Sequence, residues 1–134
     1  TIVWSPLAGG ALSGKIRRNK PAPKDSRLGQ IKFVSYDDEV LFEVTDVLEQ
    51  IANERQKTIP QVALNWILRR PTVCNIVVGE EQLKQNLGAV GWELSAQEVE
   101  RLDKASDVRM LYPYWHQKGF PQLSHTLGQL RGTF

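Results

Sequence analysis

Two short, uninterrupted apolar runs, residues 1–4 and residues 75–78, constrain the fold of this chain more than any other feature. Both are rich in β-branched residues, and Pro6 and Gly79 mark where they stop. Continuous apolar strands are typical of a parallel sheet covered by helices. Two strands cannot enclose such a core by themselves. We therefore expect further strands from an absent part of a longer chain or from a partner.

The rest of the first hundred residues carries helix signals. Thr58 with Gln61 and Ser95 with Glu98 have the spacing of capping boxes, in which a hydroxyl and a side chain three residues later satisfy the first amides of a helix. Apolar side chains at helical spacing extend the prediction to four helices: residues 38–55 after an aspartate cap, 58–69, 80–87 and 95–105. The order of strands and helices predicts an α/β fold.

Composition excludes several classes of function. The chain has 134 residues with 17 basic and 15 acidic side chains, and its net charge of +2 does not favour nucleic acid as a partner. A single cysteine, Cys74, excludes an internal disulfide and a zinc cluster, and we expect it to be a buried, inert thiol. The sequence has neither a signal peptide nor an apolar run of roughly 20 residues, so we expect a cytoplasmic protein with no membrane contact and no metal.

The stretch "IVVGEEQL" (76–83) places a glycine turn between a strand and a helix start. Amide groups at helix starts attract phosphates. The residues that follow Gly79, however, are the acidic Glu80 and Glu81. A phosphate site here would have to tolerate two carboxylates.

The motifs "WSPLAGGALSGK" (4–15), "SRLGQ" (26–30), "QVALNWIL" (61–68), "GEEQLKQNLGAVGWELSAQEVERLDKAS" (79–106) and "YPYWHQKGF" (112–120) resemble the C-terminal part of the aldo-keto reductases. The resemblance is to the bacterial aldo/keto reductase group, which is also similar to the β-subunits of voltage-gated potassium channels. It implies a (β/α)8 TIM barrel. Residues 1–106 would form the last two βα units, and residues 107–134 would form the C-terminal loop. Segment 112–120 would either shape the substrate mouth or strap the outside of the barrel.

The resemblance also implies a binding site for NADP(H) at the carboxyl ends of the strands. Trp4 would stack on the nicotinamide ring, and Lys15 and Arg27 would reach the dinucleotide from the loops. As alternatives, Trp4 would be a core aromatic and Lys15 a solvated loop residue. The remaining positions matched to cofactor contacts are Ser5, Pro6, Leu7 and Ala8 after the first strand, Gly79 after the second, and Gln82, Gln85 and Asn86 on the following helix. For the last three of these positions, the alternative is an ordinary polar residue on the surface.

The turn after Gly79 departs from the family pattern. Three residues, including the one that holds the 2′-phosphate of NADP, are missing between this glycine and Glu80. Either the turn is truly short, which would weaken NADP(H) binding, or a mobile loop has escaped observation. We favour the second interpretation, because the pattern on both sides of the gap is kept.

The resemblance implies hydride transfer between NADP(H) and a small carbonyl or alcohol, but it places no catalytic residue in this chain. The family's catalytic tetrad lies in the first half of the barrel. The tyrosines and histidines here stand outside the family's catalytic context: Tyr36, Tyr112, Tyr114, His116 and His125. The expected partners are the carbonyl substrate, the remainder of the barrel and, in a homo-oligomer, a second copy of the protein. The alternatives are a nucleotide-sensing regulatory subunit without turnover and a fragment that binds no cofactor.

Overall fold

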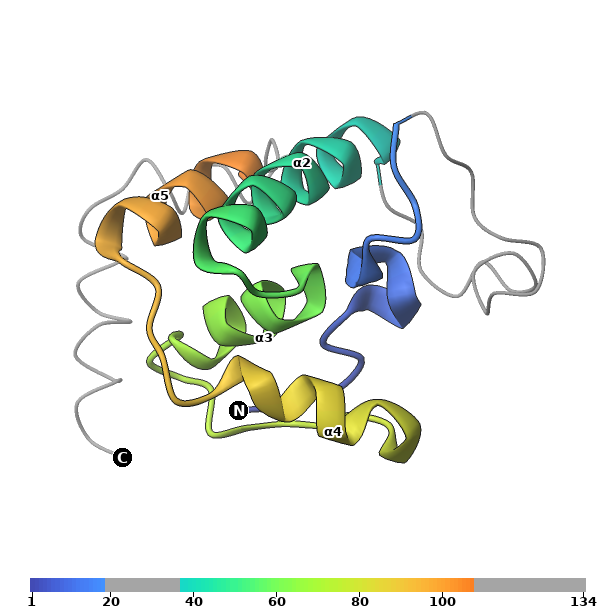
Figure 1. The fold of residues 1–134 in the computed structure, drawn as a ribbon, viewed down its shortest axis with the longest axis vertical. Helices are drawn as coiled ribbons and strands as arrows, with labels where there is room; N and C mark the ends of the chain where they lie inside the picture. Colours follow the sequence, from blue (N-terminus) through green and yellow to red (C-terminus); the bar gives the residue numbers. More distant parts are fainter. Residues whose placement is uncertain (19–36, 108–134) are drawn as a thin grey trace, which may run out of the picture.

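The computed structural model describes residues 1–18 and 37–107 (Figure 1). The predicted Arg27 and segment 112–120 lie outside these residues. The described elements, in chain order, are β1 (Ile2–Val3), the 3-10 helix η1 (Ala8–Ser13), α2 (Asp38–Arg55), α3 (Ile59–Leu68), β2 (Asn75–Ile76), the 3-10 helix η2 (Glu80–Gln82), α4 (Leu83–Asn86), the 3-10 helix η3 (Leu87–Ala89) and α5 (Ala96–Ala105).

The two predicted strands form a parallel pair, although each is shorter than its apolar run. Ile2 is in register with Asn75, and Val3 with Ile76. The amide of Val77 continues the ladder by donating to the carbonyl of Val3 at 2.9 Å. The parallel pairing brings the carboxyl ends of both strands to the same edge.

The strand faces remain open in the described residues. Ile2 is 66% exposed and Val77 is 50% exposed, which is unusual for apolar residues of a parallel sheet. Cys74, expected to be buried, is exposed as well. That prediction was wrong because it rested on the apolar run beside Cys74, and the described sheet of two strands leaves this residue uncovered.

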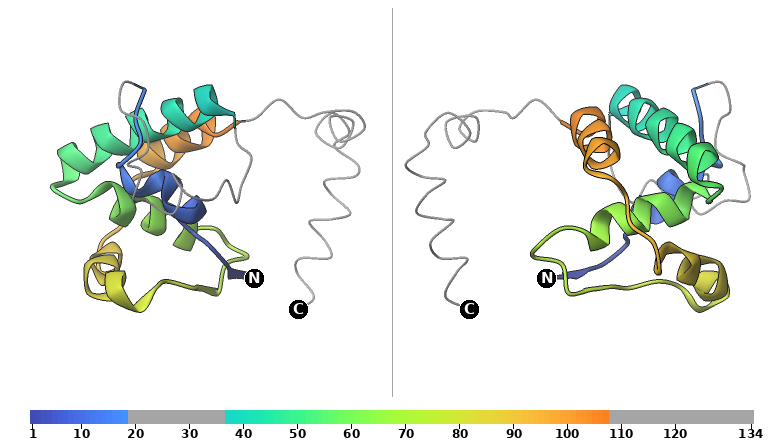
Figure 2. Two further views of the ribbon diagram at one scale, coloured as in Figure 1. Left: turned by 90° about the vertical axis from the view of Figure 1, so that its right-hand side faces the viewer. Right: turned by 60° about the vertical axis from the view of Figure 1, so that its left-hand side comes forward.

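The core lies among the three longer helices. In Figure 2, α2 and α5 lie side by side and run in opposite directions. α3 lies between this pair and α4. The largest fully buried side chains of this core are Leu48 and Ile51 from α2, Val62 from α3, and Leu102 from α5. The helices therefore supply a substantial core that does not depend on the sheet.

Local capping sets the starts of these helices where the sequence predicts them. Asp37 accepts from the amide of Glu39 at 2.9 Å and caps α2. The capping boxes at the starts of α3 and α5 are both complete. Capping fixes the first turn, because four amides at a helix start have no partner within the helix.

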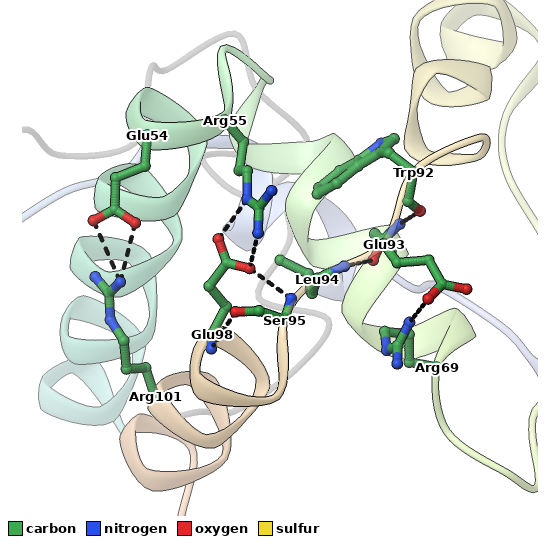
Figure 3. A network of polar contacts seen from close by, with 10 residues as sticks. Glu54, Arg55, Arg69, Trp92, Glu93, Leu94, Ser95, Glu98 and Arg101 are labelled. Carbon is green, nitrogen blue, oxygen red and sulfur yellow. Dashed lines mark hydrogen bonds and ion pairs between the residues drawn. The ribbon is translucent and has the colours of Figure 1, made fainter.

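Ion pairs join α2 to α5 (Figure 3). Arg55 donates from two nitrogens to the two carboxylate oxygens of Glu98, each at 2.6 Å. Glu98 also accepts from the amide of Ser95 at 2.6 Å, so one carboxylate closes both a capping box and an interhelical pair. Farther along the helices, Arg101 donates to Glu54 at 3.1 Å in a more exposed pair.

The predicted helix 80–87 has a different form. Residues 80–89 run as η2, α4 and η3, and the α-helical part has only four residues. None of the three pieces has a side-chain cap hydrogen bond. So short a helix is not stable by itself, and neighbouring elements must hold it in place.

Candidate functional site

A cavity of about 1240 Å³ opens where the chain leaves both strands. Its walls come from the segment after β1, from the start of α3 and from residues 77–86 after β2. The predicted site residues that line it are Trp4, Ser5, Pro6, Leu7, Lys15, Gly79, Gln82, Gln85 and Asn86. Residues more than seventy positions apart in the sequence thus meet at one hollow.

Among the described residues, Ala8 is the one predicted site residue that is absent from the cavity lining. It does not line the cavity but packs against the small apolar cluster of Ala11, Ile16 and Leu41. Its φ of +50° turns the chain back on itself, and its amide donates to the carbonyl of Ser5 at 2.9 Å. Ala8 therefore lies behind the lining of the cavity, and its contact with a cofactor stays a prediction.

Trp4 stands at the mouth of this cavity and is 68% exposed. In the described residues Trp4 is not part of the core; its place in a whole barrel, as a stacking surface or as a core aromatic, stays a prediction. Its indole offers a large flat surface to the solvent at the end of β1. Such a surface can stack on an aromatic ring of a ligand.

The segment after β1 is a series of tight turns that approaches α3 closely. The hydroxyl of Ser5 accepts from the amide of Gly9 at 3.0 Å and fixes the first turn. Gly14 has a φ of +77°, and a Cβ there would lie 2.7 Å from Cδ1 of Ile59. Neither this backbone φ nor the space beside Ile59 suits a residue with a Cβ, so the position requires glycine. Lys15 follows it and lies beside the start of α3.

The cationic side chains along the cavity differ in their partners. Arg17 forms an ion pair with Glu49 of α2. The ammonium of Lys57 lies 5.5 Å from the centre of the Trp92 ring. Lys15 is exposed, and no carboxylate of residues 1–18 and 37–107 is paired with it. Among the described cations of the cavity wall, Lys15 is the one best placed to meet an anionic ligand.

The far wall carries the three predicted polar residues. Gln82 and Gln85 are exposed, whereas Asn86 is only 8% exposed, so it is not a plain surface residue. The sequence predicts Gln82 and Asn86 on one face of a single helix, but Gln82 ends η2 and Asn86 ends α4. Both nevertheless line the cavity together with Gln85.

The turn into this wall is short. The amide of Gln82 donates to the carbonyl of Gly79 at 3.3 Å, and the chain runs on from Gly79 to Glu80 without interruption. This contiguous sequence has the short turn, so the interpretation that we favoured, a mobile loop that escaped observation, does not hold for this chain. Glu80 also lines the cavity and brings a carboxylate to its rim.

The start of α3 is a part of the site that sequence reasoning treated only as structure. Lys57, Thr58 and Pro60 line the cavity beside the cap of this helix. The capping box marks the helix start in the sequence, but it does not reveal what that start faces. The parallel sheet predicted from the sequence is the signal that points to it, because a helix that connects parallel strands returns along the sheet.

The described residues hold no group of three or more histidine, cysteine, aspartate or glutamate side chains suited to a metal ion. None of the helices in the described ranges is long and apolar enough to cross a membrane. The tyrosines and histidines named above all fall in residues 19–36 and 108–134, outside the described part.

Comparison with known proteins agrees with the resemblance seen in the sequence. A family model described as "Aldo/keto reductase family" matches residues 1–107. A probable voltage-gated potassium channel subunit beta from Arabidopsis thaliana is 38% identical over 96 residues, which cover 65% of this chain and 28% of that protein.

Two relatives named as reductases are similar at a comparable level. The chloroplastic pyridoxal reductase of Arabidopsis thaliana is 35% identical over 107 residues, 78% of this chain and 28% of the relative. The NADH-specific methylglyoxal reductase of Escherichia coli is 35% identical over 99 residues, 69% of this chain and 29% of the relative. The chain spans less than a third of the length of these relatives, and it belongs to the aldo/keto reductase family.

Proposed function

We propose that this chain forms the last two βα units and the C-terminal loop of a (β/α)8 barrel, and that the whole protein is an oxidoreductase that uses a nicotinamide cofactor, either NADP(H) or NAD(H). The substrate class is a small carbonyl compound or the corresponding alcohol. The observation that carries the proposal is the cavity at the carboxyl ends of β1 and β2, lined by residues of both units. Ligands of barrel enzymes bind at this end of the strands.

The residues of the cavity fit a nicotinamide dinucleotide. Its volume of about 1240 Å³ exceeds that of typical small-molecule sites. The exposed indole of Trp4 provides a stacking surface, and the ammonium of Lys15 provides a point charge for a pyrophosphate. The bound cofactor would supply the hydride, while this chain would hold and orient it.

We expect the remainder of the barrel to be the partner that covers the exposed strands. Ile2, Trp4 and Val77 leave apolar surface open at the sheet, and Leu83 and Leu87 do so on the segment after it. Neighbouring strands and helices would cover this surface and supply the catalytic groups. A homo-oligomer and a cytoplasmic location stay predictions; one relative is named as chloroplastic.

The most specific part of the proposal is the preference of the site for NADP or NAD. NADP is the cofactor implied by the resemblance, but a relative is named as NADH-specific. The short turn brings Glu80 to the cavity rim, where its carboxylate opposes the extra phosphate of NADP. We therefore expect the protein to accept NAD(H) about as well as NADP(H).

A coupled binding and turnover experiment tests the proposed function on the protein at its natural length. NADPH and NADH are titrated first, and methylglyoxal and pyridoxal are then added while the absorbance of the reduced nicotinamide is followed. Binding with turnover supports the oxidoreductase. Binding without turnover supports the nucleotide-sensing subunit, a candidate favoured by the potassium channel relative. Absence of binding supports a fragment that takes no cofactor and overturns the proposal.

A further inference from the structure

Two amide side chains of α3, Gln61 and Asn65, hold the backbone of the segment that forms the far cavity wall. They are four residues apart and lie on the same face of the helix. The side-chain nitrogen of Gln61 donates to the carbonyl of Gln85 at 2.8 Å. That of Asn65 donates to the carbonyls of Ala89 and Trp92, each at 2.9 Å.

Asn65 has nearly all of its hydrogen-bonding capacity in use. It is only 5% exposed, and its side-chain oxygen accepts from the amide of Leu94 at 3.4 Å in addition to the two donated bonds. A buried amide that is satisfied in this way fixes its partners strongly, because breaking the contacts would leave polar groups without partners. Asn65 thus fixes the end of the segment at residues 89–94.

Gln61 joins two elements through one side chain. Its oxygen accepts from the amide of Thr58 at 3.1 Å and completes the capping box of α3, while its nitrogen holds the carbonyl of Gln85. The approach is close, since a Cβ on Gly88 would lie 2.2 Å from the side-chain nitrogen of Gln61. The hydrogen bonds of Gln61 therefore connect the cap of α3 to the far cavity wall.

The segment needs this support. Its α-helical part is four residues long, and its pieces lack side-chain caps. A helix of this length has no stability of its own in water. The residues that it presents to the cavity, Gln82, Gln85 and Asn86, depend on contacts from outside the segment for their positions.

We propose that Gln61 and Asn65 are positioning residues, which hold the segment 82–92 so that its polar side chains can bind the adenosine end of the cofactor. This inference rests on the proposed function. Neither residue lines the cavity, so each acts through the backbone that it holds. The nicotinamide end, beside Trp4 on the opposite wall, does not depend on them.

Gln61→Glu separates the two roles of Gln61. Glutamate still accepts from the amide of Thr58 and keeps the capping box, but it has no N–H to donate to Gln85. Gln97→Glu is the matched control, because it adds the same charge at an exposed position of α5 away from the cavity. Gln61→Met, which removes both the donor to Gln85 and the acceptor for Thr58 without adding a charge, serves if the glutamate variant does not fold.

The experiment measures ADP and nicotinamide mononucleotide binding by calorimetry, and amide hydrogen exchange of residues 82–92, in the protein at its natural length. We expect Gln61→Glu to speed exchange in this segment and to weaken ADP binding roughly two- to tenfold, the loss of one neutral hydrogen bond. Mononucleotide binding should stay within about twofold, and Gln97→Glu should change neither probe.

The outcomes separate this inference from the proposed function. Equal losses for both probes in Gln61→Glu would mean a general loss of structure and overturn the positioning role, as would unchanged exchange in residues 82–92. A wild-type protein that binds neither probe would overturn the proposed function and the adenosine role together. In that case exchange alone still decides whether Gln61 holds the segment.

Discussion

Val3 and Ile76 are register partners in the parallel pair, so the chain leaving β1 and the chain leaving β2 enter the cavity at the same level. Trp4 follows the first strand directly, and Gly79 lies three residues after the second. The backbone hydrogen bonds of the pair thus bring the starting points of the two halves of the candidate site side by side. Whatever stabilises this pair of strands also sets the width of the site.

The isolated 134-residue chain should not unfold as a cooperative monomer. Its helices have a core of their own, but Ile2, Trp4 and Val77 remain exposed around a sheet of two described strands. Isolated two-stranded pairs are marginal in water. Thermal denaturation followed by circular dichroism, with the mass measured by sedimentation, checks this expectation. A sharp melt at monomer mass would show that the strands need no partners.

Lys15→Ala should weaken NADP and NAD alike. The two cofactors share the pyrophosphate that the lysine is proposed to meet. Losing a charge-assisted contact costs about 1.5–3 kcal/mol, which is roughly ten- to a hundredfold in affinity. Calorimetric titration of both cofactors measures it, with Lys104→Ala, on the exposed surface of α5, as the control. A variant that loses NADP but keeps NAD would place Lys15 at the 2′-phosphate instead.

Glu80→Gln should shift the cofactor preference toward NADP. The short turn after Gly79 brings Glu80 to the cavity lining, where its carboxylate would repel the 2′-phosphate of a bound NADP. Removing one such partly solvated charge should improve NADP affinity roughly two- to fivefold and leave NAD affinity unchanged. The ratio of the two dissociation constants is the measurement. An unchanged ratio would show that the 2′-phosphate binds away from this turn.

Glu98→Gln should destabilise the packing of α5 on α2 by about 1–3 kcal/mol, because it removes the charge that Arg55 meets at two points. Glutamine keeps the capping box with Ser95, so the helix start is preserved. Glu100→Gln is the control, since Glu100 forms an exposed pair with Lys104 and should change stability by less than about 0.5 kcal/mol. Urea denaturation of the protein at its natural length measures both.

The same pair predicts a pH dependence. Hydrogen bonding from Arg55 lowers the pKa of Glu98 from 4.5 to about 2. Because the pKa is lower in the folded state, the stabilisation is complete above about pH 4.5 and is lost as the pH falls toward 2. Glu98→Gln should flatten stability over this range. A wild-type slope that survives the substitution would assign it to other carboxylates, such as Asp103, whose pKa is lowered by hydrogen bonding from Arg70.

The starts of α2, α3 and α5 could be predicted from the sequence because capping is local. Thr58 with Gln61, and Ser95 with Glu98, make their hydrogen bonds within four residues, and the structure contains them. The strands could be predicted for the same reason, since a continuous apolar run needs no knowledge of its neighbours. The meeting of Trp4 with residues 79–86 required the resemblance to a family as well.

What the sequence did not predict depends on distant contacts. The segment 80–89 has a helical pattern in the sequence. In the structure, Gln61 and Asn65 of α3 donate hydrogen bonds to its carbonyl groups, and it forms short helical pieces instead of one helix. Ala8 turns away from the cavity because of a backbone angle that its sequence position does not reveal. Cys74 is exposed because the described sheet has two strands, which an apolar neighbourhood in the sequence could not show.

Tryptophan fluorescence during titration with NADPH and NADH tests the central claim most directly, that the cavity at the strand ends binds a nicotinamide cofactor. Trp4 is exposed at the cavity mouth, whereas Trp66 and Trp92 are half-buried around α3. We predict saturable quenching in the protein at its natural length, and the loss of much of it in Trp4→Leu. Quenching that is absent, or that is unchanged in Trp4→Leu, would contradict the account.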